Sequence, residues 1–176
     1  SSGTGVSIPP PFAMSGASNG GLLAGAAIVH RPDLWRVVVP VVPIFDQMEP
    51  LPREPQLDPV RAIFLEDYGN PDDLLMSKVL YSYSPYHNVK QGAKYPAVMF
   101  KTGDSDTRVD PLHARKMTAL VQASTGSGRA VLLHYDTKAG HSRDKPLDKA
   151  IEEQLDTLGF LLHEIGAETR DSILNH

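Results

Sequence analysis

The chain has 176 residues, of which 41% are hydrophobic and 22% are charged, and its formal net charge is -4. This length and composition favour one soluble globular domain. The 17 lysines and arginines are scattered along the sequence, so we expect no nucleic-acid partner. The chain has no cysteine, which excludes a disulfide, a thiolate metal site and a cysteine nucleophile and fits a cytoplasmic protein. Its longest apolar stretches are far short of the roughly 20 residues that cross a bilayer, so we expect no membrane association.

Residues 1–11 are rich in serine, glycine and proline and predict a flexible tail before a domain that covers residues 12–176. In this domain short apolar runs alternate with longer amphipathic segments, a pattern typical of an α/β fold with a mainly parallel sheet. The expected strands are Phe12–Ser15, Arg36–Val42, Ala97–Lys101 and Ala130–Tyr135. The expected helices are Asn19–His30, Leu74–Ser84, Leu112–Ala123 and Lys149–Ile165. Pro40 weakens the second strand, and the proline-rich segment Phe45–Ala62 predicts a loop.

The first strand runs into the sequence Gly16-Ala17-Ser18-Asn19-Gly20, and a helical pattern follows at once. A strand, a G-x-S-x-G motif and a helix form the nucleophile elbow of α/β-hydrolases, in which small residues two positions before and after the serine avoid the neighbouring backbone. Ser18 is then the candidate nucleophile, and the N–H of Asn19 can donate to an oxyanion. For the motif alone, a glycine-rich turn or a phosphate-binding loop is the alternative.

A serine nucleophile requires a histidine base and a carboxylate that orients the histidine. Asp104 and Asp106 lie in the loop after the strand Ala97–Lys101, and His141 lies in the loop after Ala130–Tyr135. The order serine, aspartate, histidine is that of the α/β-hydrolases. Considered singly, each has another explanation, because loop aspartates often cap helices and a Gly-His pair often forms a solvated turn. The other histidines lack metal-ligand spacing, and we expect neither a metal nor a cofactor.

Several segments between about Met14 and Leu162 resemble the prolyl oligopeptidase family of serine peptidases. These segments are Gly16–Leu23, Arg31–Leu34, Glu66–Gly69, Tyr83–Val89, Asp106–His113 and Ala139–His141. The resemblance implies a truncated α/β-hydrolase fold with Ser18 as nucleophile, Asp106 as acid and His141 as base. It also implies that Arg108 hydrogen-bonds a backbone carbonyl of the substrate.

The chain departs from that family in three features. No counterpart of the β-propeller or cap, or of the first half of the hydrolase sheet, precedes Ser18. We therefore expect a half-domain whose exposed sheet edge and apolar face produce homo-oligomers. The second oxyanion donor, a tyrosine hydroxyl in proline-specific members, also has no counterpart. Alignment backwards from Tyr83-Ser84-Pro85 places Val79 where those members have a tryptophan that stacks on proline, so we expect no preference for proline.

These observations predict a serine hydrolase that cleaves acyl bonds through an acyl-enzyme, with a short-chain carboxyl ester or a short peptide as substrate. Ester hydrolysis depends less than amide hydrolysis on stabilisation of the oxyanion, so we expect activated esters to be the better substrates. Two alternatives remain open. One is a peptidase of the prolyl oligopeptidase type, and the other is an inactive hydrolase fragment that acts as a binding or assembly module.

Overall fold

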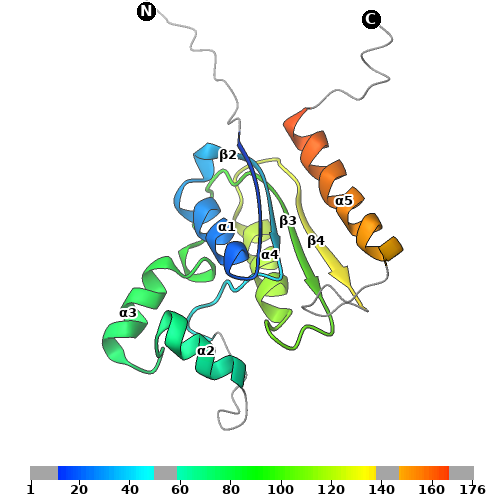
Figure 1. The fold of residues 1–176 in the computed structure, drawn as a ribbon. Helices are drawn as coiled ribbons and strands as arrows, with labels where there is room; N and C mark the ends of the chain where they lie inside the picture. Colours follow the sequence, from blue (N-terminus) through cyan, green and yellow to red (C-terminus); the bar gives the residue numbers. More distant parts are fainter. Residues whose placement is uncertain (1–11, 50–58, 138–146, 167–176) are drawn as a thin grey trace, which may run out of the picture.

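The protein, as a computed structural model, contains one parallel sheet of four strands in the order β1-β2-β3-β4 (Figure 1). The structure describes residues 12–49, 59–137 and 147–166, so the expected tail at residues 1–11 lies outside the described residues. The strands are β1 (Phe12–Ala17), β2 (Trp35–Val41), β3 (Ala97–Gly103) and β4 (Val131–Asp136). The expected short, mainly parallel sheet is confirmed.

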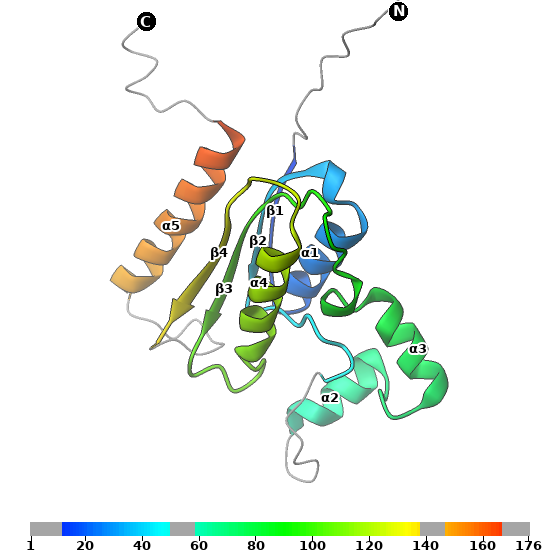
Figure 2. The same ribbon diagram turned by 180° about the vertical axis from the view of Figure 1, so that it is seen from behind.

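Five α-helices and two short 3-10 helices accompany the sheet in the described ranges. They are α1 (Asn19–His30), α2 (Pro59–Tyr68), α3 (Leu74–Tyr83), α4 (Leu112–Ser124), α5 (Leu147–Ile165), η1 (Pro32–Leu34) and η2 (Tyr86–Asn88). Helices α1 and α4 cover one face of the sheet, and α5 lies on the opposite side of the molecule (Figures 1 and 2). No helix in these ranges is both long and apolar enough to cross a bilayer.

Alternation along the strands explains this layering, because successive side chains of a strand point to opposite faces of the sheet. On β3, Val98 and Phe100 belong to the core cluster that also contains side chains of α1 and α4. Lys101, which follows Phe100 in the strand, points to the other face, where its Nζ donates to Thr157 Oγ1 of α5 at 2.8 Å. The central strands are buried on both faces, as expected for a parallel sheet between helices.

The expectation for the segment Phe45–Ala62 was wrong at its C-terminal end, where α2 begins at Pro59. Proline is well tolerated in the first turn of a helix, because the N–H that it lacks has no intrahelical partner there. Pro40 does occupy β2, and the Cα pairing of β2 with β3 includes Val38 and Val41 but neither of the two residues between them. The missing N–H of Pro40 therefore interrupts the ladder without ending the strand.

Candidate active site

Ser18 lies between the last residue of β1 and the first residue of α1, with φ of 55° and ψ of -117°. Positive φ is unfavourable for a residue with a side chain, and such strain clusters at functional sites. Two hydrogen bonds hold the turn: the N–H of Ser18 donates to Val41 O at 2.9 Å, and its carbonyl accepts from the Leu22 N–H at 3.1 Å. The geometry is that of a tight strand-to-helix turn that projects the serine hydroxyl outward.

The glycines of the motif have different steric roles. A Cβ on Gly16 would lie 2.2 Å from the carbonyl oxygen of Gly20, so no side chain fits at position 16. A Cβ on Gly20 would meet no atom within 4 Å, so the expectation that crowding requires glycine on both sides of Ser18 was wrong for this position. Crowding returns at Gly21, where a Cβ would lie 2.9 Å from Pro43. The turn is therefore tight because Gly16 and the backbone of Gly20 touch.

Asn19 is the first residue of α1 and lines the same pocket as Ser18. The first N–H groups of a helix have no intrahelical acceptor and carry the positive end of the helix dipole. The N–H of Asn19 is thus in a position that suits donation to an oxyanion, and this role stays a prediction.

The two candidate acids in the loop after β3 differ in environment. Asp106 is 7% exposed, and its Oδ1 accepts hydrogen bonds from the N–H groups of Arg108 and Val109, both at 2.9 Å. Asp104 is exposed, and its carboxylate accepts a hydrogen bond from the Tyr135 hydroxyl on β4. A buried carboxylate fixed by backbone donors suits the orienting member of a triad better than an exposed one. These contacts favour Asp106, and His141 lies outside the described residues.

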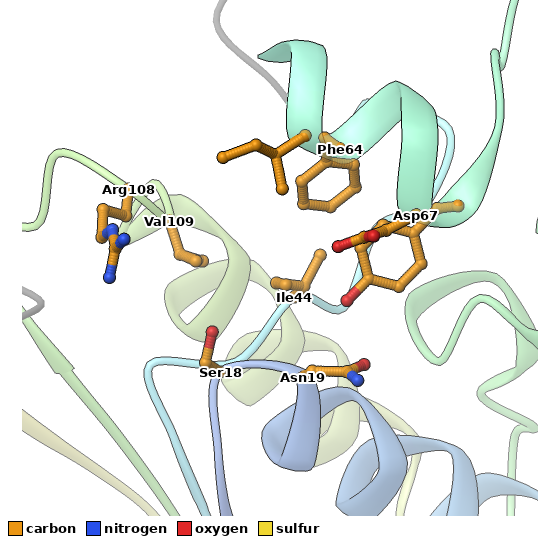
Figure 3. A pocket seen from close by; sticks show the side chains of 9 residues that line it. Ser18, Asn19, Ile44, Phe64, Asp67, Arg108 and Val109 are labelled. Carbon is orange, nitrogen blue, oxygen red and sulfur yellow. The ribbon is translucent and has the colours of Figure 1, made fainter. Parts of the chain in front are cut away.

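A pocket of about 250 Å³ opens above Ser18 (Figure 3). Its lining residues come from the nucleophile turn, from the segments after β2 and β3, and from α2. They are Ser18, Asn19, Ile44, Ile63, Phe64, Asp67, Tyr68, Arg108 and Val109. Ile44, Phe64 and Val109 also form a buried apolar cluster with Leu22 of α1. The structure thus brings three of the predicted site residues, Ser18, Asn19 and Arg108, to one pocket with an apolar interior.

The expectation that Val79 occupies the ring-stacking position was wrong. Val79 lies on α3, is 55% exposed and does not line the pocket. Aromatic side chains of α2 line it instead: Phe64 is 7% exposed, and its ring centroid lies 4.5 Å from that of Tyr68. Counting back from the segment Glu66–Gly69, which begins two residues after Phe64, would have found them, whereas counting from Tyr83 led to the wrong helix.

Burial raises the pKa of the Tyr68 hydroxyl, and the nearby Asp67 and Tyr83 raise this pKa further. The hydroxyl therefore stays protonated at neutral pH and can donate a hydrogen bond within the pocket.

A buried ion pair fixes the segment that follows β2, where Ile44 lies. Asp46 is 4% exposed, its Oδ2 accepts from Lys116 Nζ of α4, and its Oδ1 accepts from the Met48 N–H at 2.9 Å. Its own N–H donates to His113 Nδ1 at 3.1 Å, which makes a second connection to α4. Burial alone would raise the pKa of the Asp46 carboxyl, but the hydrogen bonds from Lys116 and Met48 outweigh burial and lower it.

The segment that contains His141 is bounded by β4 and α5. Lys149 in the first turn of α5 lies 3.3 Å from both carboxylate oxygens of Asp136 at the end of β4. This contact connects the end of β4 to the first turn of α5.

Comparison with known proteins agrees with these features. Residues 10–168 match the model of the prolyl oligopeptidase family. The chain is 40% identical over 156 residues to a prolyl endopeptidase of Elizabethkingia miricola. This alignment covers 88% of this chain and 21% of the relative. It is 38% identical over 155 residues to a prolyl endopeptidase of Dictyostelium discoideum, and this alignment covers 85% of this chain and 19% of the relative.

Solved structures show the same relationship. A structure from a study of two prolyl endopeptidases matches with a TM-score of 0.82 at 38% identity, over 91% of this chain and 23% of that one. Oligopeptidase B from Leishmania major matches with a TM-score of 0.81 at 30% identity, over 90% of this chain and 22% of that one. The chain thus spans about a fifth of the length of the relatives it matches, and the sheet corresponds to part of their α/β-hydrolase domain. The chain belongs to the prolyl oligopeptidase family.

Proposed function

We propose that this chain carries the nucleophile, the acid and the base of a serine peptidase. The observation that supports this most directly is the strained backbone of Ser18, held between β1 and α1 at the mouth of the pocket. A conformation that costs about 1–3 kcal/mol persists where the surrounding structure enforces it, and such sites are commonly functional. The family membership supports the same assignment.

In the proposed reaction, Ser18 Oγ attacks the carbonyl carbon of the scissile bond while His141 accepts the hydroxyl proton. The C–N bond then breaks, His141 returns the proton to the leaving amine, and an acyl group stays on Ser18. Water then attacks the acyl group while His141 accepts its proton. The bond to Ser18 Oγ breaks, His141 returns the proton to Oγ, and the carboxylic acid product leaves. Asp106, fixed by the N–H groups of Arg108 and Val109, orients the imidazole, and the Asn19 N–H stabilises the oxyanion.

We propose a peptide substrate that is cleaved after proline. Phe64 and Tyr68 provide aromatic faces on which a pyrrolidine ring can pack, and Ile44 and Val109 complete an apolar surface beside Ser18. The names of the relatives, which include several prolyl endopeptidases, support this choice. It replaces the expectation based on Val79 and makes a peptide a better candidate than a simple ester.

A fluorophosphonate probe tests the central claim, because it labels only a serine that is activated as a nucleophile. We expect labelling of the wild-type chain and no labelling of Ser18→Ala. Ser77→Ala is the matched control, because Ser77 is a partly exposed serine on α3 outside the pocket, and labelling should persist. Equal labelling of wild type and Ser18→Ala would exclude Ser18 as the nucleophile. Wild type without labelling would favour a binding or assembly module.

A further inference from the structure

Gln47 is a completely buried glutamine in the segment that follows β2. Its Nε2 donates to the carbonyl oxygen of Ile44 at 3.2 Å, whereas its Oε1 has no hydrogen-bond partner among the described residues. A buried amide oxygen without a donor is unfavourable, and native proteins contain few of them. An apolar side chain of the same size would avoid this penalty, so stability alone does not explain a glutamine at this position.

Ile44, to which the Gln47 side chain donates, forms part of the pocket wall beside Ser18. It is buried, and it packs with Phe64 and Val109 in the apolar cluster that lines the pocket (Figure 3). Its carbonyl oxygen is largely shielded from water and therefore requires a donor from the protein. Among the described residues, the Ile44 backbone has the hydrogen bond from Gln47 and no other.

The backbone of Gln47 is anchored to a different part of the molecule. Its N–H donates to Ser84 Oγ at 3.1 Å, and Ser84, which follows the last residue of α3, is completely buried. The same Oγ donates to the carbonyl oxygen of Phe45 at 3.1 Å. Ser84 thus fixes the backbone of this segment, and the Gln47 side chain connects that fixed point to Ile44.

We propose that Gln47 is a positioning residue, which holds Ile44 in the pocket wall and thereby supports selectivity for proline as the residue that acylates Ser18. This inference rests on the proposed peptidase function. A proline ring would cover Ile44 and the ring of Phe64, whereas the methyl group of alanine reaches little of that surface. Displacement of Ile44 therefore weakens the reaction of a proline substrate more than that of an alanine substrate.

The test compares the hydrolysis of Gly-Pro and Gly-Ala anilides by Gln47→Met, because methionine has a similar volume and no strong hydrogen-bond donor. In this variant the buried oxygen without a partner is that of Ile44 itself, so we expect Ile44 to move. The ratio of kcat/KM for proline over alanine should fall about tenfold. The urea midpoint should stay near that of wild type, because one unpaired buried oxygen replaces another.

Gln122→Met is the matched control. Gln122 lies on α4 outside the pocket, and its Nε2 donates to the carbonyl oxygen of Val131 at 2.8 Å. The substitution therefore removes the same type of hydrogen bond at a distance from the site, and the ratio should equal that of wild type. A ratio of two substrates also cancels any difference in the fraction of folded enzyme.

A ratio that is unchanged in Gln47→Met, or that falls equally in Gln122→Met, would overturn this inference. The proposed function would survive either result, since the fluorophosphonate probe would still label Ser18 in both variants. A wild-type chain that neither reacts with the probe nor cleaves either anilide would overturn both proposals. The two readouts therefore separate an error about selectivity from an error about the reaction.

Discussion

At the residue scale, contacts with the neighbouring strand and helix hold the backbone of Ser18 in its unfavourable conformation. Its φ of 55° is maintained by the hydrogen bond to Val41 on the neighbouring strand and by the contact of Gly16 with the Gly20 backbone. The strain is thus opposed by both the sheet and the helix. Displacement of either element would let the turn relax and move the Ser18 hydroxyl.

We predict that Gly16→Ala lowers the free energy of unfolding by about 1–3 kcal/mol, the usual cost of forcing an atom into filled space. The new methyl carbon would lie 2.2 Å from a backbone oxygen that cannot rotate away. Gly20→Ala is the comparison, because its methyl carbon would meet no atom within 4 Å. Urea unfolding of the two variants measures the difference, and equal losses would contradict the steric role given to Gly16.

We predict that Asp106→Asn lowers kcat about 10³- to 10⁴-fold, because a neutral amide holds the wrong tautomer of the base. Asp104→Asn should change kcat little, since Asp104 is exposed and accepts a hydrogen bond from Tyr135 instead. Steady-state hydrolysis of a Gly-Pro anilide measures both. A damaging Asp104→Asn with a tolerated Asp106→Asn would show that the acid was assigned to the wrong residue.

Local sequence was sufficient to predict the strand-to-helix turn that holds Ser18. The choice of Ser18 followed from glycine spacing between a strand and a helix, and these neighbours lie close along the chain. Phe64 does not follow from that glycine spacing, because its place in the pocket depends on how α2 folds back over the ends of β1 and β3. Val79 was predicted by counting from Tyr83, which lies on the other side of that path, whereas the segment Glu66–Gly69 lies on α2 itself or directly after it.

At the element scale, the Asp46–Lys116 ion pair connects the segment after β2 to α4. The segment has little regular structure of its own between Val41 and the end of the described range at residue 49. Its position, and with it that of Ile44 in the pocket, depends on polar contacts with α4. Removal of one partner of a buried pair leaves an uncompensated charge, which is more costly than loss of a surface pair.

We predict that Lys116→Met lowers the free energy of unfolding by about 3 kcal/mol at neutral pH. The pKa of Asp46 is lower in the folded protein than in the unfolded chain, where it is about 4. The ionised carboxylate therefore stabilises the folded protein above that pH, and this stabilisation disappears as the pH falls through the lower folded pKa. The difference between variant and wild type should therefore shrink below about pH 4. Urea unfolding at neutral and acidic pH measures it.

Arg31→Met provides the control for this prediction. It breaks the ion pair with Asp33, whose two side chains are 60% and 61% exposed, so water replaces the lost contact. The free energy of unfolding should hardly change at any pH. A loss in Arg31→Met as large as that in Lys116→Met would mean that burial of Asp46 does not determine the cost.

Helix limits show why some elements were easier to predict than others. The expected helix Asn19–His30 agrees with α1 at both ends, because a tight turn precedes it and an Arg-Pro pair follows it. The sequence of α2 has no comparable boundary, since its first residue, Pro59, closes a proline-rich segment that reads as a loop. Packing of Phe64 and Tyr68 over the pocket, which is a tertiary contact, accounts for this helix.

At the scale of the whole molecule, α5 is attached to the sheet by polar contacts and exposes its apolar residues. Lys101 Nζ on β3 donates to the carbonyl oxygen of Glu153 at 3.0 Å and to Thr157 Oγ1. The exposed apolar side chains recur every three or four residues, between 45% and 76% exposed: Leu147, Ile151, Leu155, Leu158, Leu162 and Ile165. This apolar stripe of α5 is the kind of surface that soluble proteins cover with a partner.

We propose that two copies of this chain associate through the apolar stripe of α5, and we predict a concentration-dependent oligomer in sedimentation experiments. β1 lies at one edge of the sheet and could extend the contact, because its pairing among the described residues is with β2 alone. The double variant Leu155→Lys/Leu158→Lys places two charges on the stripe and should sediment as a monomer at concentrations where wild type associates.

The control for the stripe is His163→Lys, which places a lysine at an exposed polar position of the same helix outside the apolar stripe. It should associate like wild type, because the apolar area available for burial is unchanged. If the stripe variant also associates like wild type, the contact does not use α5, and the edge of β1 becomes the surface to test. A wild-type chain that stays monomeric across the micromolar range would contradict the prediction, since an uncovered stripe of six apolar side chains would then be compatible with a solitary molecule.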